Sequence, residues 1–183
     1  MTTFTNTAES ARETAPQYIA ALLSLLGERD PMRVQEQLAD SVDDAVAGLS
    51  ERELRTPERP GKWSIIQVLQ HLVETELVYA YRTRTILTRE TPPIEGYDQD
   101  RWASTLRYQD APIAETLLEL RALRGRNLRL LRALSEGELD RAGLHSERGL
   151  ESVRQIRSLI AAHDLVHRNQ IERIKRSLTT ATG

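Results

Sequence analysis

The stretch Ala161-Ala162-His163-Asp164-Leu165-Val166-His167 lies in the middle of a long predicted helix that covers residues 150–177. Apolar residues recur at helical spacing on both sides of this stretch, at Ile156, Ile160, Ile171 and Ile174. The two histidines take positions in the same stripe, so both imidazoles are expected to face the core. Because they are four residues apart, His163 and His167 can bring two ring nitrogens to one point, as a transition metal requires.

His71 is the best candidate for a third ligand. It lies on the apolar face of another predicted helix, whose start is marked by Ser64 and Gln67 as a capping box and by Trp63, which can pack on Val68. A histidine can also sit at a helix seam, hydrogen-bonded to a neighbour. Three buried imidazoles each need a partner, however, so a shared metal explains them better than separate structural roles.

The composition indicates a single all-α domain over residues 1–183, with residues 1–8 frayed. Only 4% of the residues are aromatic, while leucine, alanine, glutamate and arginine are plentiful, which favours helix over sheet. The net charge of −2 gives no positive field that would attract nucleic acid, so we do not expect nucleic acid as a partner. The best apolar run, residues 18–26, is too short to span a bilayer, and the polar start is unlike a signal peptide, so we expect a cytoplasmic protein without membrane contacts.

The remaining helices follow from periodicity and capping signals. They are expected at residues 9–26, 32–47 and 112–134, with one further turn at 135–140. Asp30 and Pro31 predict the start of the second of these, and Asp110 is expected to cap the helix that follows it, which places Leu123 or Arg124 on its inner side. Residues 141–149 are expected to form a loop. The long connection 89–110 separates the second and third core helices, and connections of that length are more often functional than filler.

Four other side chains are candidates for a role at the site, and a fourth histidine is not. Glu74, one turn after the histidine of its helix, is a candidate extra ligand or base, although an exposed charge is the simpler interpretation. Tyr97 and Trp102 lie in the long connection and could fold over an open metal site to bind a substrate. Arg82 points to the same side of its helix as His71; solvated surface is the default interpretation, and an anion contact for a substrate is the alternative. His145, in the expected loop, is not expected to be a ligand.

The donor set limits the chemistry. The chain contains no cysteine, so a metal would be held by nitrogen and oxygen ligands, and any thiol in the reaction would have to arrive on a small molecule. Asp164 stands where a zinc protease of the His-Glu-x-x-His type has glutamate, which excludes that class. Three imidazoles leave coordination positions open, as in catalytic rather than structural sites.

Five segments together resemble the DinB/YfiT-like superfamily, in the order that this family shows: 61-GKWS-64, 71-HLVETE-76, 97-YDQDRW-102, 145-HSERG-149 and 163-HDLVHRNQI-171. The resemblance runs from about residue 59 to residue 174. It implies a four-helix bundle with a non-sequential helix order and a divalent metal, often nickel or zinc, bound by three histidines. Carried over to this chain, the ligands are His71, His163 and His167.

The resemblance leaves three functions open. Some members of the family resemble S-transferases that use bacillithiol or mycothiol, or mycothiol-dependent isomerases, and others are named metal-dependent hydrolases or damage-inducible proteins. A divalent cation deprotonates a coordinating thiol, so we expect transfer of a bacillithiol-type thiol to an electrophilic small molecule. Hydrolysis by a metal-bound water is the alternative reaction, and a non-catalytic, stress-related metal-binding bundle is the alternative of another class. A homodimer is also possible, because relatives are often dimers.

Overall fold

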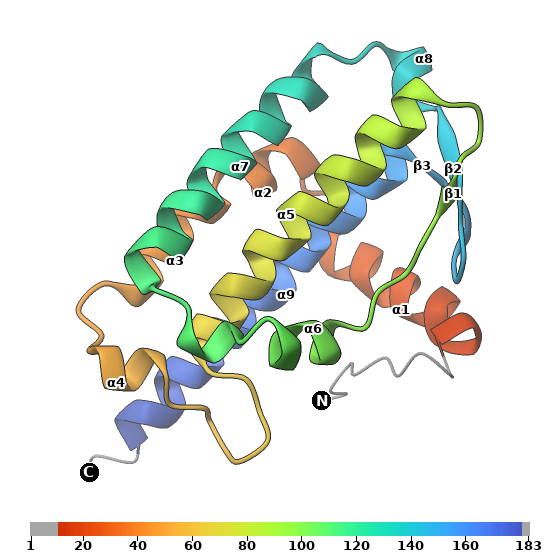
Figure 1. Cartoon of the computed structure of the whole chain (residues 1–183). Coiled ribbons are helices and arrows are strands. Elements are labelled where there is room, and N and C mark those ends of the chain that lie inside the picture. Colours follow the sequence, from red (N-terminus) through yellow and green to blue (C-terminus); the bar gives the residue numbers. More distant parts are fainter. Residues whose placement is uncertain (1–10, 181–183) are drawn as a thin grey trace.

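The computed structural model describes residues 11–180, so the expectation for residues 1–8 lies outside the described part of the chain. Its main body is a four-helix bundle, as expected. The bundle helices are α2 (Pro31–Glu36) continued by α3 (Leu38–Val46), α5 (Ile65–Thr88), α7 (Ile113–Ala133) and α9 (Val153–Thr180). Helices α5 and α7 run in the same direction, opposite to α3 and α9 (Figure 1).

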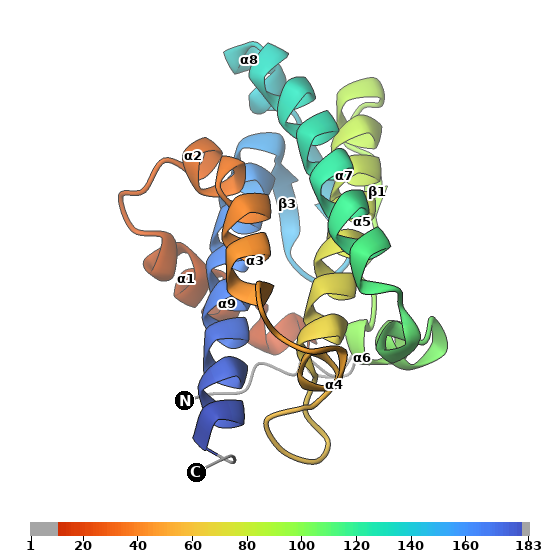
Figure 2. The ribbon, with the colours of Figure 1, turned by 90° about the vertical axis from the view of Figure 1, so that its left-hand side faces the viewer.

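The helix order around the bundle does not follow the sequence. Helix α5 packs against α7 and α9, and the α2–α3 pair packs against the same two helices (Figure 2). The first and second bundle helices therefore lie at opposite corners. The long connection after α5 makes this arrangement possible, because it carries the chain back to the end of the bundle where α5 begins, so that α7 can run parallel to α5.

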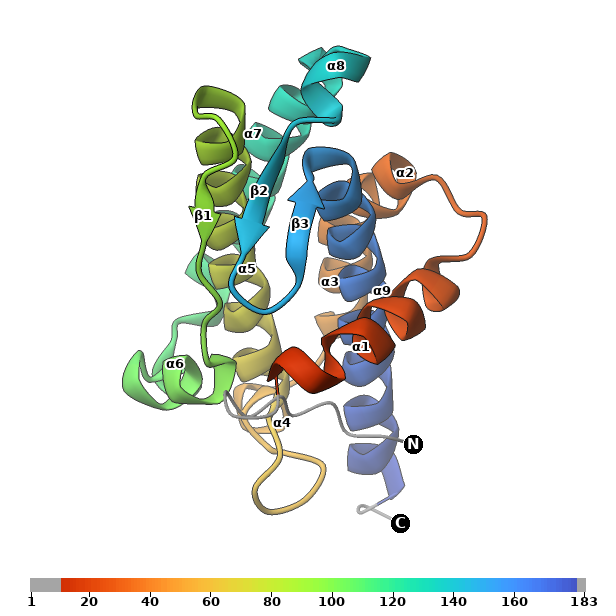
Figure 3. The same ribbon diagram turned by 90° about the vertical axis from the view of Figure 1, so that its right-hand side faces the viewer.

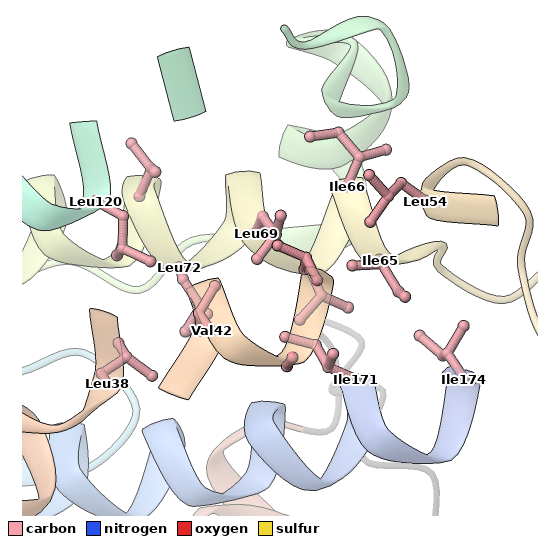
Figure 4. Close-up of a cluster of buried hydrophobic side chains, with 14 residues drawn as sticks. Leu38, Val42, Leu54, Ile65, Ile66, Leu69, Leu72, Leu120, Ile171 and Ile174 are labelled. Carbon is pink, nitrogen blue, oxygen red and sulfur yellow. The ribbon is translucent and has the colours of Figure 1, made fainter. Parts of the chain in front are cut away.

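A cluster of buried apolar side chains holds together the half of the bundle in which α5 begins and α9 ends (Figure 4). It draws on α3, α5, α7 and α9, and its fully or almost fully buried members include Leu38, Val42, Ile65, Ile66, Leu69, Leu72, Leu120, Ile171 and Ile174. Each such side chain contributes about 1.5–3 kcal/mol relative to an exposed one. The apolar stripe of the last helix is thus confirmed as a core face, with Ile171 and Ile174 in this cluster.

The start of α5 is set by the expected capping box. The Ser64 backbone N–H donates to Gln67 Oε1 at 2.9 Å, and the Ser64 hydroxyl donates to Gln109 Oε1 at 2.7 Å. The second bond joins the first turn of α5 to the end of the long connection. Trp63, just before the cap, packs against the core cluster that contains Val68.

The single helix predicted over residues 32–47 is wrong, because the chain bends at Gln37 and forms α2 and α3. The predicted cap is correct: the Asp30 carboxylate accepts from the backbone N–H groups of Met32 and Arg33, and Pro31 opens the helix. Both halves keep their helical pattern and both pack on α7 and α9. Gln37 keeps right-handed helical backbone angles, and its N–H donates to the Arg33 carbonyl oxygen at 3.2 Å, so the interruption is confined to one residue.

The loop predicted over residues 141–149 is also wrong. It forms an antiparallel hairpin of β2 (Ala142–His145) and β3 (Gly149–Ser152), and β1 (Pro93–Ile94) of the long connection pairs in parallel with β2. This small sheet lies beside α5 (Figure 3). Since β3 occupies residues 149–152, helix α9 begins at Val153 instead of residue 150.

The other short elements connect or cover the bundle: α1 (Ala11–Leu26), α4 (Glu51–Leu54), α6 (Gln99–Thr105), the 3₁₀ turn η1 (Tyr108–Asp110) and α8 (Glu136–Leu139). Helix α1 packs on α9, and α8 is the predicted extra turn. The predicted cap at Asp110 is wrong: Pro112 is the N-cap of α7, and the Asp110 carboxylate instead accepts from Arg107 Nε at 3.0 Å. Within residues 11–180, no helix has both the length and the apolar character needed to cross a membrane.

Candidate metal centre

The three predicted ligands meet in the interior of the bundle. His71 comes from α5, and His163 and His167 come from successive turns of α9. The Nε2 atom of His163 lies 3.0 Å from Nε2 of His71 and 3.0 Å from Nε2 of His167. All three side chains are buried, and one nitrogen from each falls in a group whose members lie within 4.8 Å of one another.

A hydrogen bond orients His167. Its Nδ1–H donates to Gln170 Oε1 at 2.8 Å, which leaves Nε2 with a free lone pair pointing at the cluster. Ligating histidines in metalloproteins are commonly held by such a bond at the second nitrogen. Gln170 was not predicted as part of the site, although its position three residues after His167, on the same face of the helix, indicates such a contact.

The protein keeps these imidazoles neutral. Burial, reinforced by the neighbouring imidazoles, lowers the pKa of His71 and of His163 well below the ordinary histidine value. Burial also lowers the pKa of His167 to about 4, although its bond to Gln170 opposes the shift. Neutral imidazole is the form that binds a metal, so the three side chains are ready ligands at neutral pH.

The arrangement fits a divalent cation. Three nitrogens bound to one ion at about 2.1 Å lie about 3–3.4 Å apart. Two of the three pairs here, both involving His163, are 3.0 Å apart, and the third pair lies within 4.8 Å. Hydrogen bonds alone do not satisfy the cluster, because His163 Nε2 can donate to only one of its two neighbours. A cation satisfies all three lone pairs together.

A buried ion triad, formed by Glu76, Arg124 and Asp164, lies beside the histidines and was missed by the sequence analysis. The guanidinium of Arg124, on α7, donates to the Asp164 carboxylate at 2.5 and 2.9 Å and pairs with Glu76 at 2.7 Å. These side chains are at most 3% exposed. Since Glu76 is on α5 and Asp164 adjoins His163, the triad ties α7 to both helices that carry the ligands.

The pKa values in the triad reflect its burial. Burial raises the pKa of Asp164 to about 6, more than the Arg124 guanidinium lowers it. Burial alone would lower the pKa of Arg124, but the carboxylates of Asp164 and Glu76 raise it above its ordinary value. Asn127 adds a bond to the Glu76 carboxylate at 2.9 Å. Removal of any one member of the triad would therefore leave a buried charge without its full set of partners.

Trp63 and α6 lie next to His71. The indole ring centroid of Trp63 is 5.1 Å from the imidazole centroid of His71. Trp63 also hydrogen-bonds to the Asp100 carboxyl of α6, although burial and the nearby Asp98 carboxylate raise the pKa of Asp100 overall. Trp63 thus links α6 of the long connection to His71, one of the three predicted ligands.

The four other predicted side chains line one pocket, which we call the α5–β1 pocket. It has a volume of about 500 Å³ and lies between α5 and residues 93–102, with Glu74, Arg82, Tyr97 and Trp102 among its lining residues. The rings of Tyr97 and Trp102 are 4.5 Å apart, and burial raises the pKa of Tyr97 to about 12, so its phenol stays protonated. Glu74 is half-buried. The interpretation of Arg82 as solvated surface is wrong, since it is only 4% exposed.

His145 lies in β2 and is not part of the three-histidine cluster. Its Nδ1 accepts from the Glu147 backbone N–H at 3.1 Å, so the proton is on Nε2. Burial, together with the guanidinium groups of Arg148 and Arg82, lowers the pKa of His145 to about 3. This histidine is therefore neutral at any pH at which the protein is expected to work.

We expect replacement of His145 by asparagine to reduce the acid sensitivity of the metal-free protein. The unfolded chain binds a proton at the ordinary histidine pKa of about 6.5, whereas folded His145 does not, so this residue lowers stability as pH falls from about 6.5 towards 3. Between about pH 7 and pH 5, the variant should lose roughly 1–2 kcal/mol less unfolding free energy than the wild type, measured in urea. Asparagine Oδ1 can still accept from Glu147, and equal losses in both proteins would contradict the assignment.

The chain is similar to a known protein family and to several of its members. A family model of the DinB superfamily matches residues 35–171, a range that contains all three histidines. A protein of Geobacillus thermodenitrificans (strain NG80-2) is 31% identical over 139 residues, which cover 76% of this chain and 71% of the relative. One of Oceanobacillus iheyensis is 32% identical over 132 residues, covering 72% and 76%. The names of both propose metal-dependent hydrolysis.

A solved structure agrees with the fold. YfiT from Bacillus subtilis, described as a four-helix bundle of unusual topology, superposes with a TM-score of 0.76 at 23% identity and covers 98% of this chain and 93% of its own. The extent of the family match, the sequence relatives and the common fold lead to one conclusion. The chain belongs to the DinB superfamily.

Proposed function

We propose that this protein is a metal-dependent enzyme that hydrolyses a small molecule at the three-histidine centre, with zinc or nickel as its cation. The observation that carries the proposal is the convergence of three neutral Nε2 atoms, 3.0 Å apart in two of the pairs, in a buried site. The names of the sequence relatives support the same class of reaction.

Each side chain around the site would have its own role in the reaction. His71, His163 and His167 would hold the cation, and Gln170 would keep His167 in the ligating tautomer. When bound, a divalent cation supplies Lewis acidity, which lowers the pKa of a coordinated water or thiol. Glu74 is the carboxylate that follows His71 by three residues and lines the α5–β1 pocket, so we propose it as the general base.

The same pocket would bind the substrate. Trp102 and Tyr97 present aromatic rings to it, and Arg82 presents a guanidinium group. Its mostly apolar lining and its volume of about 500 Å³ suit a small molecule. No basic surface or membrane contact is part of this proposal.

Transfer of a low-molecular-weight thiol, such as bacillithiol, is the second candidate. The absence of cysteine from the chain is compatible with it, because any thiol that reached the cation would come from a co-substrate. An open three-histidine centre would serve this reaction equally well.

One experiment separates the candidates. Zinc-loaded and nickel-loaded protein is assayed with a panel of aryl esters and amides, and in parallel with N-acetylcysteine plus 1-chloro-2,4-dinitrobenzene. We expect ester or amide hydrolysis at least about a hundredfold faster than in metal-free protein, and a loss of about a hundredfold in kcat on replacing Glu74 with glutamine.

The controls decide between the remaining outcomes. Glu90, an exposed acid beyond the end of α5, provides the matched variant Glu90→Gln, for which we expect wild-type rates. Turnover in the thiol assay alone would replace hydrolysis by thiol transfer. Stoichiometric metal without turnover in either assay would leave a non-catalytic metal-binding bundle and overturn both enzyme proposals.

A further inference from the structure

Arg82 is a buried cation without a carboxylate partner in the described part of the chain. Its side chain forms no ion pair within residues 11–180; it donates to the Glu95 carbonyl oxygen and lies 5.3 and 5.9 Å from the ring centroids of Tyr79 and Tyr97. A carbonyl and two aromatic faces attract a guanidinium group but do not neutralise it. Burying an uncompensated charge is costly, so this position favours an anion from outside the chain.

The acidic side chains nearby do not fill this role. The Glu147 carboxylate lies against Gly96 but forms no ion pair with Arg82. Glu151 is fully buried and binds Arg148 through two bonds of 2.7 and 2.9 Å, so its charge is already matched. The Glu95 side chain is exposed to water. Glu74 precedes Arg82 by eight residues on α5, which separates their Cα atoms by about 12 Å along the helix axis.

A second buried donor faces the same turn of α5. A Cβ at Gly143 would lie 3.1 Å from Ile86 Cγ1, so this face of β2 packs on the turn of Ile86. His145 is two residues farther along the same face, and β2 runs opposite to α5 (Figure 3), which brings His145 over the preceding turn, that of Arg82. His145 Nε2–H is buried and has no acceptor among the described residues. The Nε2–H group of His145 is therefore a second hydrogen-bond donor without an acceptor within residues 11–180, next to the Arg82 guanidinium.

The space in front of Arg82 is largely apolar. Arg82 lines the α5–β1 pocket together with Leu77, Val78, Tyr81 and Trp102. Leu77 and Tyr81 are 46% and 69% exposed, so they present apolar surface at the pocket. The pocket therefore offers a cation at one end and apolar walls beside it, with Glu74, three residues after His71 on α5, at the other end.

We propose that the α5–β1 pocket binds a small molecule with one carboxylate and an apolar or aromatic body, the carboxylate on Arg82 and the body against Tyr81 and Trp102. Glu74 disfavours a second negative group at the other end. The identification of this ligand with the substrate rests on the proposed function, whereas the binding itself does not require the metal.

The test uses 4-phenylbutyrate and its uncharged amide, 4-phenylbutyramide, as probes of the full chain. The two tryptophans give separate indole N–H signals in ¹H–¹⁵N spectra: Trp102 lines the pocket and Trp63 lies beside the metal ligand His71. We expect the carboxylate to shift the Trp102 signal and to bind at least about tenfold more tightly than the amide, as for a charge-assisted hydrogen-bonded pair. In Arg82→Met, both probes should bind equally weakly.

Arg84→Met is the matched control, because Arg84 is on the same helix but donates to Ala80 and Asn127, towards α7. It should keep the tenfold preference. Equal binding of carboxylate and amide by the wild type, or an unchanged preference in Arg82→Met, would overturn the proposal; if that variant fails to fold, the wild-type comparison still decides. Zinc is added to the protein in a separate titration. If zinc does not shift the Trp63 signal but 4-phenylbutyrate shifts the Trp102 signal, the proposed metal centre is contradicted and the carboxylate site in this pocket is not.

Discussion

Replacing His163 and His167 together with alanine should abolish metal binding. We expect the wild type, purified without a tag, to hold about one equivalent of zinc or nickel, and the double variant to hold less than about a tenth. Two of the three convergent Nε2 atoms are removed, and His71 alone is a weak ligand. Elemental mass spectrometry measures the content directly.

Thermal unfolding gives an independent measure of the same loss. At a free metal concentration about a thousandfold above its Kd, metal binding should raise the unfolding free energy of the wild type by about 4 kcal/mol. It should leave the unfolding free energy of the double variant unchanged. His145→Asn is the control, since it removes a buried histidine outside the cluster and should leave both readouts unchanged. Full metal content in the double variant would exclude the shared site. A wild type that takes up no metal after reloading would make the three histidines a polar core.

Replacing Arg124 with methionine should cost about 3–5 kcal/mol of unfolding free energy in metal-free protein. Methionine fills part of the space of the arginine stem, but it leaves the carboxylates of Asp164 and Glu76 buried without their counter-charge. Urea unfolding at neutral pH measures the loss. A combined variant with Asp164→Asn and Glu76→Gln should recover much of it, because no buried charge then remains unmatched.

Arg121→Met provides the comparison for this second prediction. Arg121 is on the same helix and pairs with Asp40 and Asp43, but these side chains are exposed, so their removal should have a much smaller effect. A similar loss in both variants would show that the buried triad contributes no more than a surface ion pair. Metal content, measured beside stability, would show whether the triad also positions the ligand helices.

Much of the bundle could be predicted from sequence because its signals are local. The stripe through Ile156, Ile160, Ile171 and Ile174 and the capping box at Ser64 each depend on residues within a few positions of one another. The same holds for two of the three proposed metal ligands, since His163 and His167 are four residues apart on one helix. His71 was reachable because it lies on the core face of its own helix.

What the sequence alone determined, then, is which faces of the helices turn inward and which side chains those faces carry. Only the tertiary structure decided which of them meet: β1 pairs with β2 about fifty residues later, Arg124 reaches Asp164, and Arg82 is buried under a segment that periodicity assigns to a loop. These contacts join segments that are distant in the chain, and their free energy depends on how the elements pack rather than on the order of residues within any one of them.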